Sequence, residues 1–342
     1  MGFRKDWILK YLLITLVALL ASVSGLDAAR YYVAPQASPE AEGQHWGDPI
    51  SLTRASQLAV AGDEIWARSG AYHPDRTDRT RSFVFAAGVQ IYGGFAGTET
   101  EPGQRNRSAN PSILTGDLGT RGRADDNSFT VVVLRSRTGL SSTLDGFVIR
   151  DGFAKNFNWN KKRQNVGGAL FIEPTATGDA IHHISNCTFL NNVAHNGGAV
   201  FVSPGRTTFT NCLFRSNQAD KYGGAVYVNG EAAMASPVFQ GCIFENNRGN
   251  YAGGGIAHDA TNGVVRPLIV GCTFVGNYSN SNGAAVYNRG AHEGDCDLVI
   301  QECTYRDNTS TIGEDVADSG VSVATRTRAR QHGGGTLRPG RK

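Results

Sequence analysis

The stretch Asn186-Cys187-Thr188-Phe189-Leu190-Asn191-Asn192 decides the fold, because four later stretches of the chain repeat its pattern. Each copy has Cys, any residue, Phe or Tyr, two further residues and then Asn. The cysteines of the five copies are Cys187, Cys212, Cys242, Cys272 and Cys303, at steps of 25, 30, 30 and 31 residues. A second, glycine-led motif recurs in phase with the first, and its copies begin at Gly167, Gly197, Gly223, Gly253 and Gly283. Repeats of this length bury no core alone and are typical of solenoids, in which each repeat packs on its neighbours.

One repeat contains short strands joined by turns. Its Cys and aromatic residue stand two positions apart, so on a strand both side chains point to the same face. The Asn falls where that strand ends, and Asn tolerates left-handed backbone and hydrogen-bonds within turns. The glycine motif supplies a second bend. Stacked repeats, each strand parallel to its equivalent in the next coil, predict columns of Cys, aromatic and Asn side chains spaced by about 4.8 Å.

The predicted fold class is therefore all-β, a right-handed parallel β-helix (solenoid) with a short N-terminal capping helix. A propeller would need a longer period and antiparallel blades, and leucine-rich repeats need a Leu pattern that these repeats lack. Handedness does not follow from the spacing; right-handed crossovers are the general preference of parallel connections. The capping helix is expected within Ser51–Ala61, with Ser51 as its N-cap and Gly62 as its stop.

Composition and charge exclude several classes of protein. The 342 residues include 43 Gly and 40% apolar residues without a G-X-Y period, which argues against collagen and against a disordered chain. The net charge is +3, of which +6 lies in 326–342 and +1 in 1–29, so the segment 30–325 carries −4. A mildly acidic body argues against a nucleic-acid partner.

The first residues have the pattern of a secretory signal peptide. Arg4, Lys5 and Lys10 precede the apolar run 12–21, and small residues follow it. A membrane anchor is the alternative, but the run is short for a membrane span. We therefore expect the mature chain to be exported, with no membrane span.

The chain is predicted to have three regions. Residues 1–29 form the signal peptide, and 30–312 form the β-helix domain. Within that domain, 30–120 hold the N-terminal cap and first coils, and 140–312 hold the repeats. The basic segment 313–342 lacks apolar periodicity and is predicted to be disordered.

The repeats resemble those of the polymorphic outer membrane proteins, whose units carry Gly-Gly-Ala followed by Ile or Val, and Phe-x-x-Asn. Examples here are Gly197–Val200 and Phe189–Asn192. More broadly, residues 31–312 resemble bacterial secreted β-helix proteins of the pectin-lyase-like superfamily. The resemblance implies a secreted or cell-surface location, associated with the outer membrane. It leaves activity open, because the superfamily includes lyases, hydrolases, epimerases and non-enzymatic adhesins.

Most cysteines are expected to be buried free thiols. Cβ atoms stacked about 4.8 Å apart are farther from each other than the roughly 3.8 Å that a disulfide favours. Cys296 lies outside the repeat, which leaves a bridge to Cys303 open. A second column is expected on the outer face, packed beneath flanking loops or exposed to sugars, and is formed by Phe171, Phe201, Tyr227 and Tyr287 with a break at Ala257.

The insertion 154–166 is the candidate binding site. A loop lengthened on one coil is a usual place for function on a solenoid, and basic residues beside an aromatic ring suit an acidic polysaccharide. The candidate binding residues are Asp151, Lys155, Trp159, Lys161, Lys162 and Arg163. A merely solvated loop is the alternative interpretation.

No catalytic residue, metal ligand or cofactor is predicted. The nearest catalytic candidates do not reproduce the motifs of polygalacturonases or pectate lyases, and they are Asp145, Asp151, Asp179, His182 and His183. The favoured function is therefore non-enzymatic: adhesion, or a surface that binds an extracellular polysaccharide or a host or cell-surface component. The alternative is a polysaccharide lyase or glycoside hydrolase that acts on acidic polysaccharide from a site within 145–183.

Overall fold

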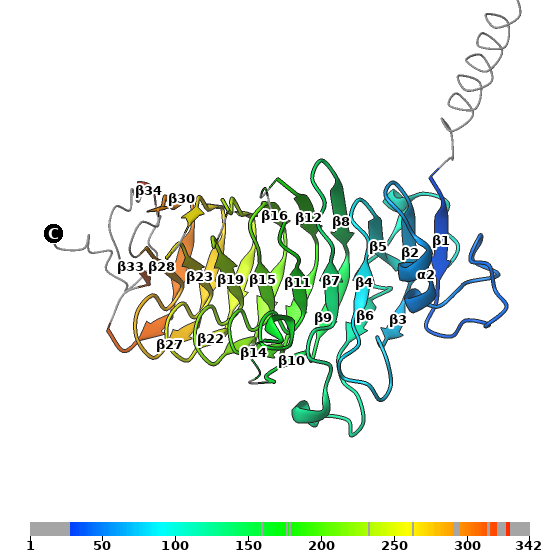
Figure 1. The fold of residues 1–342 in the computed structure, drawn as a ribbon, viewed down its shortest axis with the longest axis horizontal. Helices are drawn as coiled ribbons and strands as arrows, with labels where there is room; N and C mark the ends of the chain where they lie inside the picture. Colours follow the sequence, from blue (N-terminus) through cyan, green and yellow to red (C-terminus); the bar gives the residue numbers. More distant parts are fainter. Residues whose placement is uncertain are drawn as a thin grey trace, which may run out of the picture.

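The computed structural model shows an elongated stack of coils in which four sheets run along one axis (Figure 1). The residues that it describes are 28–156, 158, 160–175, 177, 179–231, 233–261, 263–290, 295–312, 315–319 and 326–328. Every pair of neighbouring strands in these sheets is parallel. A full coil contributes one strand to each of the four sheets in turn, and we number the sheets 1 to 4 in that order. This confirms the predicted parallel β-helix.

The strands follow one another in each sheet in a fixed order. Sheet 1 consists of β1 (Arg30–Val33), β2 (Glu64–Arg68), β5 (Gln90–Phe95), β8 (Ser141–Asp145), β12 (Ile181–Ser185), β16 (Arg206–Thr210), β20 (Val238–Gln240), β25 (Leu268–Val270), β30 (Val299–Gln301) and β34 (Arg326–Arg328). Sheet 2 consists of β3 (Gly70–Tyr72), β6 (Ser112–Thr115), β9 (Phe147–Arg150), β13 (Thr188–Leu190), β17 (Leu213–Arg215), β21 (Ile243–Glu245), β26 (Thr273–Val275) and β31 (Thr304–Arg306).

The other two sheets complete each coil. Sheet 3 consists of β10 (Phe153–Ala154), β14 (Val193–Ala194), β18 (Gln218–Ala219), β22 (Arg248–Gly249), β27 (Tyr278–Ser279) and β32 (Thr309–Ser310). Sheet 4 consists of β4 (Phe83–Phe85), β7 (Val132–Leu134), β11 (Leu170–Ile172), β15 (Val200–Val202), β19 (Val226–Asn229), β23 (Ile256–Asp259), β28 (Val286–Arg289) and β33 (Val316–Ser319). A short pair joins β24 (Val264–Val265) to β29 (Asp295–Cys296).

The repeat asparagines form a continuous ladder of amide hydrogen bonds. In each step the side-chain Nδ2 donates to Oδ1 of the next Asn, at 3.0 Å for Asn217 to Asn247 and again for Asn247 to Asn277. The same Oδ1 accepts the backbone N–H of the preceding Asn, and Nδ2 also donates to a carbonyl, as from Asn247 to Phe214 O at 2.9 Å. Each amide inside the ladder thus makes four hydrogen bonds while fully buried, which fixes the register of one coil on the next.

The left-handed backbone lies one residue earlier than the sequence suggested. The positive φ belongs to the residue before the ladder Asn, with values of 55° at Asn191 and 54° at Asn246. Another left-handed residue precedes each repeat Cys, such as Asn186 with a φ of 53°. Two such bends bracket each strand of sheet 2, so the ladder Asn itself is free to turn its amide into the interior.

Aromatic columns fill the interior as the repeats predict. The rings of Phe189, Phe214, Phe244 and Phe274 stack with centroids 4.7 to 4.8 Å apart, close to the spacing of the strands that carry them. The outer column of sheet 4 is buried beneath neighbouring side chains, with Phe201 only 1% and Tyr227 9% exposed. The outward aromatic residues therefore pack beneath flanking groups, which is the first of the two expectations.

All six cysteines are buried, and none of them forms a disulfide. The five repeat cysteines occupy equivalent inward positions, as predicted, and Sγ of Cys242 lies 3.4 Å from Phe209 O. The possible bridge from Cys296 to Cys303 is wrong. Cys296 lies on β29, which pairs with β24, whereas Cys303 belongs to the column beside sheet 1 and its Sγ lies near Gln301 O and Ile269 O.

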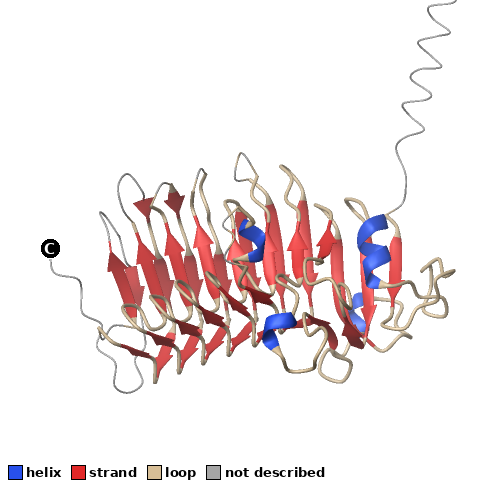
Figure 2. Ribbon diagram, turned by 60° about the horizontal axis from the view of Figure 1, so that its bottom comes forward, coloured by secondary structure: helices blue, strands red, loops and turns tan. Residues whose placement is uncertain are grey.

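A helix covers the N-terminal end of the core. Helix α2 (Leu52–Leu58) packs against β1 and β4, and Leu52 and Ala55 belong to the main core cluster (Figure 1). Ser51 caps it by accepting the backbone N–H of Arg54 at 3.2 Å, as predicted. The helix ends at Leu58, before the expected stop at Gly62. Three short 3-10 helices also lie in loops (Figure 2), namely η1 (Pro102–Gln104), η2 (Ala124–Asp126) and η3 (Lys162–Gln164).

The C-terminal boundary differs from the prediction of a disordered tail from residue 313. Val316–Ser319 adds β33 beside β28, and Arg326–Arg328 adds β34 beside β30. The open edges of β28 and β30 offer backbone groups that pair with any extended segment, so the tail need not repeat the motifs to join the sheets. The rest of the predicted tail, and residues 1–27 of the predicted signal peptide, lie outside the described residues.

We expect Asn247→Ala to lower the free energy of unfolding by at least about 3 kcal/mol, because it leaves several buried donors and acceptors of the ladder without partners. Denaturant unfolding followed by circular dichroism measures the change. Asn160→Ala, which removes an exposed amide from the insertion, is the control and should change stability little. Equal stability of the two variants would contradict the structural role of the ladder.

We expect the thiols to be inert in the folded protein. Burial raises the pKa of the Cys187 thiol to about 12, so the reactive thiolate is scarce at neutral pH. A thiol reagent at pH 8 should react slowly with native protein purified without reductant, and with six thiols after denaturation. Fewer than six after denaturation would reveal a disulfide and contradict the structure.

Candidate functional site

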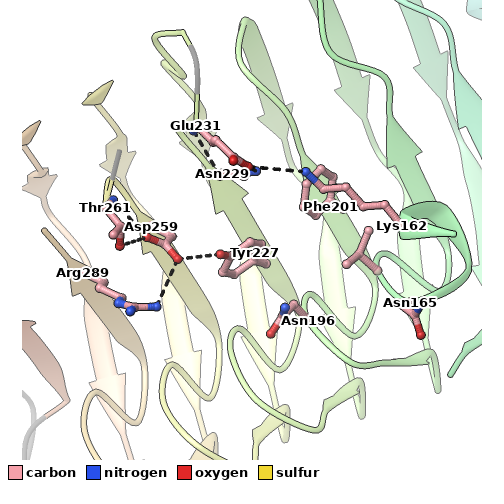
Figure 3. Close-up of a pocket in the computed structure, with 11 residues that line it drawn as sticks. Lys162, Asn165, Asn196, Phe201, Tyr227, Asn229, Glu231, Asp259, Thr261 and Arg289 are labelled. Carbon is pink, nitrogen blue, oxygen red and sulfur yellow. Dashed lines mark hydrogen bonds and ion pairs between the residues drawn. The ribbon is translucent and has the colours of Figure 1, made fainter. Parts of the chain in front are cut away.

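A cleft of about 370 Å³ lies against the outer face of sheet 4 (Figure 3). We call it the lateral cleft. It is lined by Lys162, Asn165, Val166, Asn196, Phe201, Tyr227, Asn229, Glu231, Asp259, Thr261 and Arg289. These residues come from the insertion and from successive coils, so the cleft runs along the axis of the solenoid.

Strand alternation in sheet 4 builds the base of the cleft. Val200 and Val226 point into the core, so Phe201 and Tyr227, the next residues along each strand, point outward. Phe201, Tyr227, Ala257 and Tyr287 are register partners on consecutive strands. The small Ala257 leaves room beside Tyr227, whose ring extends toward the next coil.

Asp259 is the centre of the polar side of the cleft. Its Oδ2 accepts the Tyr227 hydroxyl at 2.7 Å and lies 3.4 Å from Nη1 of Arg289. Its Oδ1 accepts the Thr261 backbone N–H at 3.0 Å and also the Thr261 hydroxyl. Burial, and then the negative charge of Asp259, raise the pKa of Tyr227 well above its usual range, so the phenol stays protonated and donates.

The register of the coils explains how this polar group forms. Asn229, Asp259 and Arg289 are register partners at the ends of β19, β23 and β28. Each follows the inward aliphatic residue of its strand by three positions, so each points outward. The sequence motifs did not reveal Tyr227, Asp259 and Arg289 as one polar group. The signal was a polar residue of changing identity at one fixed position of the glycine motif.

The insertion covers one end of the lateral cleft. Nζ of Lys162, on η3, lies 5.0 Å from the centroid of the Phe201 ring and 3.9 Å from Oε2 of Glu231. Within the loop, the Asn165 side chain donates to Asn158 O at 2.8 Å, and the loop is held to the solenoid by Thr130, whose hydroxyl donates to Arg163 O at 2.7 Å. A firmly placed insertion thus holds a lysine over the aromatic base.

The structure separates the six candidate binding residues. Lys162 lines the lateral cleft, while Lys155 is mostly buried and its Nζ lies 2.7 Å from Oδ1 of Asp220. Lys161 is exposed and Arg163 half-buried, and neither lines the cleft. Trp159 lies outside the described residues. Asp151 is at the end of sheet 2, where Oδ2 lies 3.1 Å from Nε of Arg150.

Three of the catalytic candidates from the sequence take part in separate local contacts, and a fourth, His183, is exposed on β12. Asp145 is buried beside Arg105, whose Nη1 lies 2.8 Å from Oδ1, and its Oδ2 accepts Ser185 Oγ at 2.6 Å. Asp179 accepts the Thr138 hydroxyl at 2.9 Å. His182 is bonded to Ser136 Oγ at 2.9 Å, and burial lowers its pKa to about 4. None of these residues lines the lateral cleft.

Two kinds of feature are absent from the described ranges. No group of three or more His, Cys, Asp or Glu side chains is arranged there to hold a metal ion. No helix in the same ranges has the length and apolar character that a membrane crossing requires.

Comparisons with known proteins concern the fold. Residues 168–332 match the family model described as a right handed beta helix region, so the coils are right-handed. Among solved structures, the chain is similar to pectate lyase Pel9A, at 14% identity and a TM-score of 0.43 over 89% of this chain and 81% of that one. It is also similar to a pectin methylesterase mutant in complex with a hexasaccharide, at 11% identity and a TM-score of 0.42 over 90% and 94%. No curated protein matches the sequence.

We expect Tyr227 and Asp259 to be energetically coupled. In a double-mutant cycle of Tyr227→Phe and Asp259→Asn, the coupling free energy should be about 1.5 kcal/mol, as for a hydrogen bond to a charged acceptor. Denaturant unfolding of the four proteins measures it. The same cycle with Tyr251→Phe, an exposed tyrosine of the same face, should give additive effects. Additivity in both cycles would contradict the arrangement of the cleft.

Proposed function

We propose that the protein is an exported β-helix protein, secreted or at the cell surface, whose lateral cleft binds a polysaccharide without cleaving it. One observation carries the proposal: an open cleft follows the outer face of sheet 4 over the largely buried rings of Phe201 and Tyr227, and polar side chains from the insertion and from the three consecutive strands β19, β23 and β28 surround it. Ligand sites commonly combine apolar and aromatic surface with a few fixed polar groups.

The dimensions and charge of the cleft favour a saccharide chain. From β15 to β28 it spans three strand spacings of about 4.8 Å, or about 14 Å, which accommodates a short run of sugar rings. Among its described lining residues, Lys162 and Arg289 balance Glu231 and Asp259. A polar cleft without net charge suits hydroxyl groups, which both donate and accept hydrogen bonds.

Binding is favoured over hydrolysis by the state of the carboxylates. A glycosidase places two carboxyl groups on either side of the scissile bond, and one of them exchanges a proton with it. Both oxygens of Asp259 are engaged by Tyr227, Thr261 and Arg289. Glu231 is at the mouth of the cleft, where it accepts the Asn229 amide at 3.4 Å beside Lys162.

Export is supported by the N-terminal pattern of 1–29, and the outer-membrane association rests on the resemblance of the repeats. Buried, unpaired thiols are compatible with an oxidising compartment, because the folded chain shields them from reaction. An extracellular polysaccharide, or a host or cell-surface component that carries one, is then the partner that the exported protein meets.

We expect Lys162→Ala to weaken binding of the recognised oligosaccharide about tenfold, which corresponds to about 1.4 kcal/mol. A glycan array identifies the ligand, and calorimetry compares the variants. Lys161→Ala is the matched control, because it removes the adjacent exposed lysine that does not line the cleft. Equal losses in both variants would contradict the assignment of the cleft.

The same incubations test the enzymatic alternative. New reducing ends or unsaturated sugars, formed with or without Ca²⁺ and abolished by Glu231→Gln, would replace the binding proposal with a hydrolase or lyase. Binding with unchanged saccharide supports the proposal.

A further inference from the structure

Another cleft, of about 410 Å³, lies at the ends of the first strands of sheet 2. We call it the basic cleft. The side chains that give it its chemistry are His73, Arg76, Thr115, Asp117, Arg121 and Arg150. It shares no lining residue with the lateral cleft.

The stacking of coils places three of these side chains in one row. Thr115 and Arg150 are register partners at the ends of β6 and β9. His73 directly follows Tyr72, which is paired with Leu114, so it continues the same row one coil earlier. Tyr72 and Leu114 point into the core, and the residues that follow them therefore point outward.

Two long loops supply the remaining arginines. The loop after β3 turns on Asp75, whose Oδ1 accepts the backbone N–H groups of Thr77 at 2.8 Å and Asp78 at 2.9 Å, and Arg76 lies within this turn. The loop after β6 carries Arg121. Both loops are thus placed at the ends of the same strands, with an arginine on each.

Buried contacts anchor the loop that carries Arg121. Asn127 donates from Nδ2 to Asp151 O at 2.8 Å and accepts the Leu118 N–H at 3.4 Å. Thr120 N–H donates to Asp126 Oδ2 at 2.9 Å. Asn127 is only 4% exposed, so this loop has a defined path past the cleft.

Positive charge exceeds negative charge in the basic cleft. Among its described lining residues, three arginines face one carboxylate, that of Asp117, whose Oδ1 accepts the Gly122 N–H at 3.3 Å. Asp151 does not line the cleft, and its carboxylate forms an ion pair with Arg150. The guanidinium groups of Arg76 and Arg121 are on exposed residues and make no hydrogen bond or ion pair with any described residue, so both are available to a ligand.

His73 provides a further polar group. Its Nδ1 is buried and has no hydrogen-bond partner among the described residues. Burial, and then the charge of Arg76, lower the pKa of His73, which leaves its imidazole neutral at pH 7. The cleft thus combines an unpartnered buried nitrogen with unpaired arginines.

We propose that the basic cleft is a second binding site, which takes a carboxylate or sulfate group of an acidic saccharide. The planar guanidinium groups of Arg76, Arg121 and Arg150 match the two-oxygen geometry of such anions. The saccharide rests on the proposed function, whereas the anion site rests on the basic cleft alone. A free inorganic anion offers the same chemistry, and the experiment separates the two sources.

The test compares two doubly substituted proteins of equal charge. Arg76→Gln with Arg121→Gln removes the unpaired arginines of the cleft. Arg81→Gln with Arg123→Gln removes one exposed arginine from each of the same two loops, both paired with nearby aspartates outside the cleft. Calorimetry with oligogalacturonate, a sulfated heparin oligosaccharide, a neutral cello-oligosaccharide and inorganic sulfate gives the affinities.

We expect the first variant to lose at least tenfold affinity for an acidic oligosaccharide, the control to retain it, and added salt to weaken wild-type binding. Equal affinity in both variants, or equal losses, would overturn the proposal. Inorganic sulfate binding as tightly as the oligosaccharides would also overturn it, because the site would then hold only a free anion. If the wild-type protein does not bind the neutral saccharide, the proposed function of the lateral cleft is contradicted. The assignment of an anion site to the basic cleft is unaffected by that outcome.

Discussion

The ladder of buried asparagine amides is the constraint on which the rest of the structure depends. Each amide uses all of its hydrogen-bonding groups, and its partners belong to the coils before and after it, as at Asn217, Asn247 and Asn277. A slip by one residue would break these bonds and move every Phe of the interior to the outer face. Because of the ladder, residues at equivalent positions of the sequence repeat lie next to one another in successive coils.

Fixed register also determines where function can arise. Once equivalent residues stack, a position that varies between coils becomes a row of different side chains on one face. Asn229, Asp259 and Arg289 form such a row, and Thr115 with Arg150 forms another. The conserved geometry of the backbone supplies the spacing, and the varied side chains supply the chemistry. Both clefts lie beside long loops that extend past the ends of the strands.

The sequence predicts the fold far better than the site, for physical reasons. The Cys, Phe and Asn columns are visible because interior positions tolerate little variation between coils. The left-handed residue was misplaced by one position, because Asn occurs at both candidate positions in Asn191-Asn192. Lys162 was predicted as a binding residue because the insertion that carries it interrupts the repeat. Asp259 was not predicted, because it occupies a regular position of the glycine motif. The two strands in the tail were not predicted, because a segment pairs with an open sheet edge through its backbone N–H and C=O groups and needs no sequence motif to do so.

The two clefts would recognise a polysaccharide by different interactions. In the lateral cleft, opposite charges are already paired, as Asp259 is with Arg289, so selectivity there depends on shape and on hydroxyl groups. In the basic cleft, the guanidinium groups of Arg76 and Arg121 lack partners among the described residues, so the proposed selectivity depends on the charge of the ligand. If a single saccharide chain occupies both proposed sites, the second contact is intramolecular and strengthens the binding of that chain. For the proposed pair of sites, a long saccharide bearing occasional acidic groups is therefore the ligand that would gain most over short or neutral ones.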